Sequence, residues 1–176
     1  MYRVIVLVAG CATTSSVGAQ GIGTTQTGSV EATAAVGAGF GDHHDAIDTK
    51  LQGTFGGGPR GPQGRIMISD EVIVFGDAIG WQLHVGAGAS LGNYQHPDLT
   101  LEFGGGPHWN LSTSSSPTEH KSIAVALDAI VGYAFQHFDE PSSGPSIPFR
   151  SDGAFFGLSL SIRRDQVEML GHAPFD

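Results

Sequence analysis

The chain has 176 residues, a length that suits one domain. Its formal net charge of −9, from 8 Lys and Arg against 17 Asp and Glu, excludes the basic footprint of a nucleic-acid-binding protein. The single cysteine excludes an intramolecular disulfide. No apolar run approaches the ~20 residues of a membrane-spanning helix, so a form of this chain that crosses a membrane would have to be a closed β-barrel.

The first residues contain the parts of a secretory signal. Arg3 precedes the apolar run 4–9, and small residues follow. The end of this run, Val8-Ala9-Gly10-Cys11, resembles the lipobox of bacterial lipoproteins. In that family the signal peptide is cut before the cysteine, which then carries lipid. The resemblance implies a signal peptide at 1–10 and lipid, such as palmitate, on Cys11. The alternative is a buried cysteine in an ordinary N-terminal strand.

The segment after Cys11 is poor in large apolar side chains. Residues 12–27 are mostly Thr, Ser, Gly, Gln and Ala. Such a composition buries too little apolar surface to compensate the entropy of ordering the chain. We therefore expect a lipidated N-terminus and flexible tether at 11–27, followed by one folded domain at 28–176.

Within that domain the apolar residues recur at every second position. Strict alternation is seen in 30–40, 81–91, 123–135 and 154–162, and it predicts half-buried strands. Gly and Pro clusters separate these stretches. We expect strands near 28–41, 46–56, 64–75, 78–92, 97–105, 107–113, 120–137 and 152–164. The fold class is all-β, an antiparallel meander closed into a small β-barrel of about eight strands.

The positions between the large apolar residues carry mainly small side chains. One such set is Gln82, His84, Gly86, Gly88 and Ser90. Small residues suit the narrow lumen of an eight-stranded barrel, and a membrane barrel would turn its large apolar side chains toward lipid. Charges at lumen positions carry both signs: Glu31, Lys50, Glu102, Asp128 and Arg163.

In pattern and size, the region from Gly28 to Arg164 resembles the small eight-stranded outer-membrane β-barrels of bacteria. The resemblance implies a structural or surface-interaction role in the outer membrane of a Gram-negative bacterium, with membrane lipid as partner through Cys11 and through the barrel exterior. The competing interpretation is a periplasmic, lipid-tethered barrel that keeps its apolar faces inside and binds a small apolar ligand. The sequence leaves a protein partner open.

Asp128 is the charged residue that stands out in its strand. It interrupts the otherwise apolar, Gly and Ala residues of 123–135, and an ionised carboxylate buried there needs a cation or several donors. We expect a structural ion pair across the lumen. Arg163 is the first candidate partner and Lys50 the second.

Motifs that would carry catalysis or cofactor binding are not found. The two Gly-Gly-Gly runs lack the Gly-Lys-Ser/Thr ending of a phosphate-binding loop, and no Gly-x-Ser-x-Gly element occurs. His43 and His44 are adjacent, and neighbouring residues of a strand point to opposite faces. We expect no catalytic residue, no metal site and no cofactor, and therefore a protein that is not an enzyme.

Overall fold

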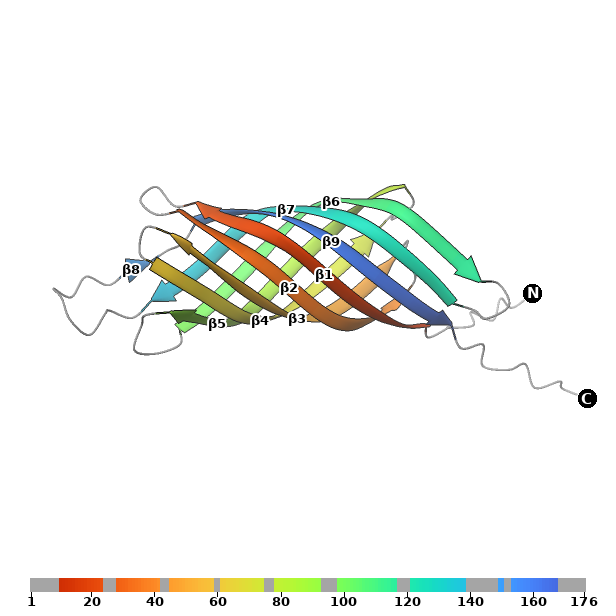
Figure 1. Ribbon diagram of the computed structural model, residues 1–176, viewed down its shortest axis with the longest axis horizontal. Helices are drawn as coiled ribbons and strands as arrows, with labels where there is room; N and C mark the ends of the chain where they lie inside the picture. The colour runs from red at the N-terminus through yellow and green to blue at the C-terminus, as the bar shows by residue number, and fades with distance from the viewer. Residues whose placement is uncertain are drawn as a thin grey trace, which may run out of the picture.

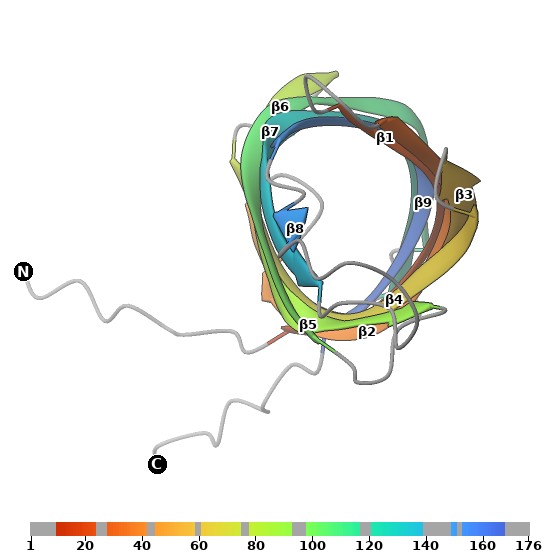
Figure 2. The ribbon, with the colours of Figure 1, turned by 90° about the vertical axis from the view of Figure 1, so that its left-hand side faces the viewer.

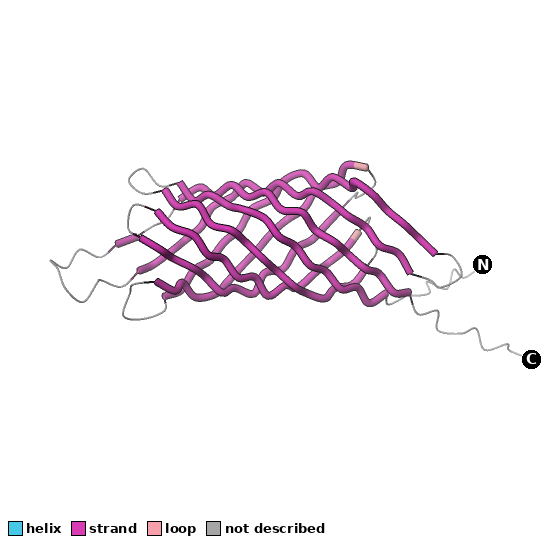
Figure 3. Tube along the Cα trace, viewed as in Figure 1, coloured by secondary structure: helices cyan, strands magenta, loops and turns pink. Residues whose placement is uncertain are grey.

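The computed structural model describes residues 10–23, 28–41, 45–58, 61–74, 78–92, 98–116, 121–138, 149–150 and 153–167. Almost all of them lie in strands, drawn magenta in Figure 3. The described part of the chain holds no helix that could cross a membrane. The strands are β1 (Gly10–Gly23), β2 (Gly28–Gly41), β3 (Ala46–Gly58), β4 (Gly61–Val74), β5 (Ile79–Gly92), β6 (Asp98–Ser116), β7 (Lys121–Phe138), β8 (Phe149–Arg150) and β9 (Gly153–Val167).

The strands form a closed antiparallel barrel. Each strand from β1 to β7 pairs with the next one along the chain, and β9 pairs with both β7 and β1. The ring therefore has eight members. Figure 2 shows the barrel end-on. The short β8 pairs with the end of β7 and is not a member of the ring. The prediction of an all-β, eight-stranded barrel is confirmed.

The two ends of the barrel differ in their connections (Figure 1). At the end where β1 begins and β9 ends, here called the terminal end, the strands are joined by 42–45, 75–78 and 117–120. At the opposite end, here called the loop end, they are joined by 24–27, 59–60, 93–97 and 139–152, the last of which contains β8. The longest connection thus belongs to the loop end.

The predicted flexible tether at 11–27 is wrong for Gly10–Gly23, which is strand β1. Its backbone pairs with β2 on one side and with β9 on the other. Ala12, Thr14, Gln20 and Ile22 are buried in the lumen, although few of these side chains are large. The composition argument failed because a strand inside a barrel is held by two ladders of backbone hydrogen bonds, which need no large side chains.

The predicted strands 97–105 and 107–113 are one strand, β6. Its pairing with β7 passes from Gly105↔Val131 to His108↔Asp128, and a bulge follows between Asn110 and Ser112. Pro107 has no backbone N–H to donate, yet it stays in register with β5. The Gly-Gly-Gly-Pro sequence interrupts one ladder without ending the strand. The predicted strand number was right because one strand was missed and another was counted twice.

Side chains of opposite character cover the two surfaces of the barrel. Trp81, Leu83 and Val85 point outward and are 50%, 52% and 60% exposed, whereas Gln82 and His84 between them are buried. A similar alternation runs along most of the other barrel strands, whereas residues 111–115 at the end of β6 are all exposed. The polar lumen is therefore as expected for a barrel with outward-facing apolar residues. The alternative with its apolar faces inside is wrong.

Candidate functional site

Toward the loop end, the lumen holds an arginine between two glutamates. Arg65 on β4 donates from Nε and Nη2 to Oε2 of Glu31 on β2, at 3.0 and 2.5 Å, and from Nη1 to Glu102 on β6. Gln20 on β1 also donates to Glu102, at 3.3 Å. All three charged side chains are at most 2% exposed. The cluster therefore ties four strands together across the lumen.

Next along the axis, Lys50 on β3 pairs with Glu71 on β4. His84 on β5 lies between carboxylates, with Nδ1 at 3.8 Å from Glu71 and Nε2 at 3.6 Å from Glu102. These two distances exceed a direct hydrogen bond, but they place a titratable ring within electrostatic reach of both acids. Lys50, the second candidate partner of Asp128, instead forms an ion pair with Glu71 on the neighbouring strand.

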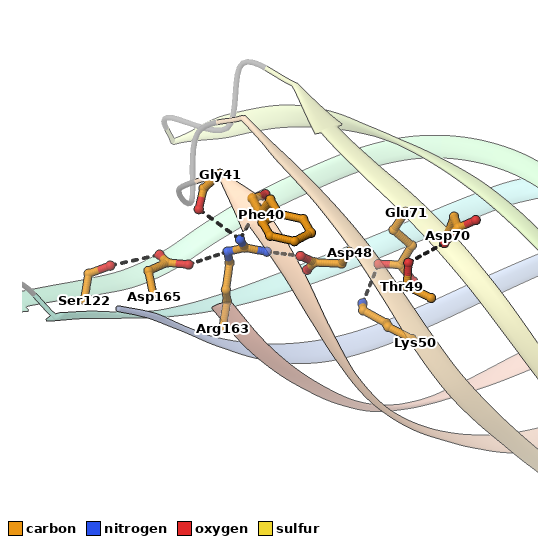
Figure 4. Close-up of polar contacts among 10 residues, drawn as sticks. All are labelled: Phe40, Gly41, Asp48, Thr49, Lys50, Asp70, Glu71, Ser122, Arg163 and Asp165. Carbon is orange, nitrogen blue, oxygen red and sulfur yellow. Dashed lines mark hydrogen bonds and ion pairs between the residues drawn. The ribbon is translucent and has the colours of Figure 1, made fainter. Parts of the chain in front are cut away.

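Toward the terminal end, Arg163 on β9 is the centre of a third cluster (Figure 4). Its guanidinium donates to Asp48 and, from Nε at 2.6 Å, to Asp165. Nη2 also donates to the carbonyl oxygens of Phe40 and Gly41, at 3.4 and 3.1 Å. Gly41 ends β2 with a φ of 94°, a conformation that favours glycine. Arg163 therefore holds the end of β2 as well as two carboxylates.

Asp128 on β7 is buried, as expected, but its partner differs from the one predicted. Its Oδ1 lies 2.5 Å from Nδ1 of His108 on β6, and its Oδ2 accepts a hydrogen bond of 2.7 Å from Ser161 on β9. Within the described residues, no ion pair joins Asp128 to Arg163. The three predicted lumen residues do line one small cavity together, but each carries a partner of its own.

Sequence reasoning missed the two histidines that serve in these clusters. His84, His96, His108 and His120 recur at every twelfth residue, a spacing that carries no chemistry by itself. The usable signal was parity: His84 shares the lumen-facing register of Gln82, and His108 shares that of Glu102. Applied to every strand, this test would have placed both rings in the lumen, among its carboxylates but beside no particular one.

The His108–Asp128–Ser161 contact has the wrong order for nucleophilic catalysis. A serine nucleophile must donate its proton to the base, whereas the hydroxyl of Ser161 donates to the carboxylate of Asp128. No group of three metal-ligating side chains occurs among the described residues. His43 and His44 lie outside these residues. Within the described residues, the arrangement is a network of ion pairs and hydrogen bonds across the lumen.

The polar clusters leave little free space between them in the lumen. Two cavities lined by lumen residues have volumes of about 20 and 30 Å³, room for a water or two. Toward the loop end, Ile22, Ala134 and Phe155 form an apolar cluster. Gly132 makes room for it, because a Cβ there would lie 2.6 Å from the ring of Phe155.

The exterior carries an apolar belt with aromatic residues near its two edges. Trp81 and Phe40 are exposed toward the terminal end. A contact group of Phe103, Tyr133 and Phe135, with ring centroids 4.9 to 6.3 Å apart, lies toward the loop end. From Ile123 to Phe135, at about 3.3 Å per residue and a tilt of about 40°, β7 spans roughly 30 Å along the barrel axis. This height matches the hydrocarbon core of a bilayer, which is about 30 Å thick.

Cys11 lies at the start of β1, at the terminal end, with its side chain exposed on the exterior. The alternative of a buried cysteine is therefore wrong, while the N-terminal strand that it assumed is present. Of the predicted signal peptide 1–10, residues 1–9 lie outside the described part of the chain, and Gly10 begins β1.

Comparison with known proteins supports the fold. No family model matches the chain, and no curated protein sequence matches it. The crystal structure of Neisserial surface protein A (NspA) is similar, with a TM-score of 0.50 and 12% sequence identity. The match covers 91% of this chain and 97% of that one. At this level of identity the likeness shows a shared barrel fold.

Proposed function

We propose that this protein is a closed, non-catalytic β-barrel of a bacterial outer membrane, with a structural or surface-interaction role. The observation that carries the proposal is the inversion of the usual polarity: a charged, hydrogen-bonded lumen inside an exposed apolar belt. A surface of this kind is favourable against lipid, and in water it would be an aggregation hazard. The similar architecture of NspA, a surface protein by its name, supports this choice.

The proposed orientation places the terminal end at the periplasm. Barrels of the outer membrane have short periplasmic turns and longer extracellular loops, and the longest connection here, 139–152, is at the loop end. The other connections at that end are short. A surface-interaction role would therefore depend mainly on 139–152, in which Phe149 and Arg150 pair with the end of β7.

A lipid on Cys11 is the second part of the proposal. Cleavage before Cys11 would remove only Gly10 from β1. The exposed thiol at the terminal end would place its acyl chains beside the barrel, in the leaflet at the periplasmic face. The anchor would thus add to a span that already holds the protein in the membrane.

Thiol accessibility tests the membrane span. In a Cys11→Ser background, Leu160→Cys places a thiol in the middle of the apolar belt, and Ser114→Cys places a matched thiol on the exposed part of β6 at the terminal end. In vesicles, we expect the thiol of the Leu160→Cys variant to react with a membrane-permeant maleimide only, and the thiol of the Ser114→Cys variant to react with a water-soluble one. Equal reaction of both thiols with the water-soluble reagent would overturn the proposal.

A further inference from the structure

A hollow of about 400 Å³ opens on the exterior where β1, β9 and β7 meet at the terminal end. Its outward-facing lining is mixed in character, with a thiol, a hydroxyl, an apolar side chain and two cations. We call it the rim hollow, and its exterior residues are Cys11, Thr13, Lys121, Ile123 and Arg164.

The strand register brings the two cations together. Arg164 lies opposite Thr13 on one side and opposite Ile123 on the other. Lys121 lies opposite Gln166, two residues further along β9, which makes it a diagonal neighbour of Arg164 at about 7–8 Å. Both side chains are exposed, and both are long enough to converge on one anionic group.

The acid of β9 next to Arg164 is turned away from the rim hollow. Asp165 points into the lumen, where it accepts hydrogen bonds from Arg163 at 2.6 Å and from Ser122 at 2.9 Å. Lys50, Arg65 and Arg163 are also in the lumen. Among the side chains that the structure describes, the exterior cations are therefore Lys121 and Arg164, so a chain of net charge −9 presents them at a single place.

Below the rim hollow the surface turns apolar at once. Ile162 and Val125 lie opposite each other in the next exterior row toward the middle of the barrel, followed by Leu160 and Leu127. A pair of cations above an apolar wall is complementary to a phospholipid, which has a phosphate above its acyl chains. Juxtamembrane Lys and Arg attract anionic lipid by about 1 kcal/mol each.

We propose that the rim hollow binds the phosphate headgroup of an anionic phospholipid, with its acyl chains against Ile162 and Val125. This inference rests on the proposed membrane span. Arg164 and Lys121 contact the phosphate, and Thr13 supplies a hydroxyl beside it. The occupant is a free phospholipid of the leaflet at the terminal end, not a lipid joined to Cys11.

Native mass spectrometry of the protein in detergent, titrated with phosphatidylglycerol or phosphatidylcholine, tests the site. We expect one phosphatidylglycerol to bind in preference to phosphatidylcholine, also in the Cys11→Ser variant. Arg164→Gln and Lys121→Gln should each weaken that binding roughly fivefold, and both together roughly thirtyfold. The control Arg150→Gln, at the loop end, should leave it unchanged.

Equal binding of both lipids, unchanged binding in the double variant, or loss of binding in Cys11→Ser would each overturn the inference. If the double variant fails to fold, Arg164→Gln alone, with the salt dependence of wild-type binding, decides the matter. Failure of the membrane span is seen separately, in the thiol reactivity of the Leu160→Cys variant in vesicles. A barrel that inserts but shows no lipid preference refutes the site alone.

Discussion

The lumen and the exterior of this barrel are built from the same strands and follow opposite rules. On β3, Lys50 is 3% exposed and its neighbour Leu51 is 55% exposed. Inside, each charge is stabilised by partners on other strands, so the lumen is specific and sensitive to single changes. On the exterior, apolar side chains need only an apolar environment such as lipid. Which apolar residue is present therefore matters less than its position along the barrel axis. The comparison shows that a residue's cost of replacement here depends on which face it occupies.

The largest effect is expected in the lumen, from Arg65→Leu. The change leaves Glu31 and Glu102 buried without their cation, which costs about 3–5 kcal/mol in free energy of unfolding. Urea titration in vesicles measures it. On the exterior, Arg164→Leu is the matched control. In phosphatidylcholine vesicles, which offer no anionic phospholipid, it should change that free energy by less than about 0.5 kcal/mol. Equal effects of the two substitutions would break the contrast between the faces.

On the exterior, the cost of a charge should follow depth along β9. Leu160→Arg, in the middle of the belt, should cost about 2–4 kcal/mol, and the cost should fall toward about 0–1 kcal/mol near the interface. Ile162→Arg should lie between these limits, since the native Arg164 is the next exterior residue toward the rim. Folding free energies in vesicles measure the gradient. A cost that is the same at both positions would argue against a bilayer around the barrel.

A smaller loss is expected from Asp128→Asn, which removes one charge-assisted contact and leaves a polar group in place. Hydrogen bonds to charged groups contribute about 1.5–3 kcal/mol, so we expect a loss within or below this range. A double-mutant cycle with His108→Gln should show a larger coupling energy than a cycle with Arg163→Gln. The reverse ranking would favour the pairing predicted from the sequence over the one in the structure.

The smallest effect on stability is expected from Cys11→Ser, a near-isosteric change on the exterior. The free energy of unfolding should move by less than about 0.5 kcal/mol. Palmitate labelling in a Gram-negative host should be lost, yet the protein should remain in the membrane fraction, because the barrel itself spans the bilayer. Wild-type protein that takes up no label in that host would refute the lipid anchor.

How far the sequence predicts the fold is seen by comparing β1 with β2. In β2, the even-numbered positions from Val30 to Phe40 are apolar. The predicted bounds, 28–41, agree with those in the structure. In β1, the alternation is carried by Thr, Ser, Ala and Gly, with only Val17 and Ile22 as large apolar residues. The segment is a strand because its backbone pairs with β2 and with β9, and β9 lies at the far end of the chain. Local composition holds no information about that pairing.

The two Gly-Gly-Gly-Pro sequences give a second limit. Gly56-Gly57-Gly58 ends β3, while Gly104-Gly105-Gly106 lies inside β6. The same sequence lies at the end of one strand and inside another. β6 continues because it remains paired with β5 as far as Pro107 and beyond. Where a strand ends therefore depends on how far its neighbouring strand pairs with it, not on its own sequence alone.

The candidate site shows the same division between what is local and what is not. That Asp128 and Arg163 face the lumen follows from the alternation of side chains between the two faces of a strand. This alternation can be found from the sequence of each strand alone. Which residues meet across the lumen depends on the stagger between strands. The stagger sets Asp128 opposite His108 and brings Arg163 to Asp48, far away in the chain. The burial of each residue could be predicted from its own strand, whereas its ion-pair or hydrogen-bond partner could not.

The pairing of β1 with β9 has a consequence for biosynthesis. β1, the first described strand along the chain, lies beside β9, the last described one, over its whole length, from Gly10↔Val167 to Gly23↔Ala154. Until β9 is made, β1 and β7 remain open edges, and open edges recruit strands from other molecules. The barrel can therefore close only after synthesis of the chain has passed Val167. A truncated mRNA that ends before the codon for Gly153 would yield an open sheet with two unpaired edge strands, at which other chains could add and aggregate.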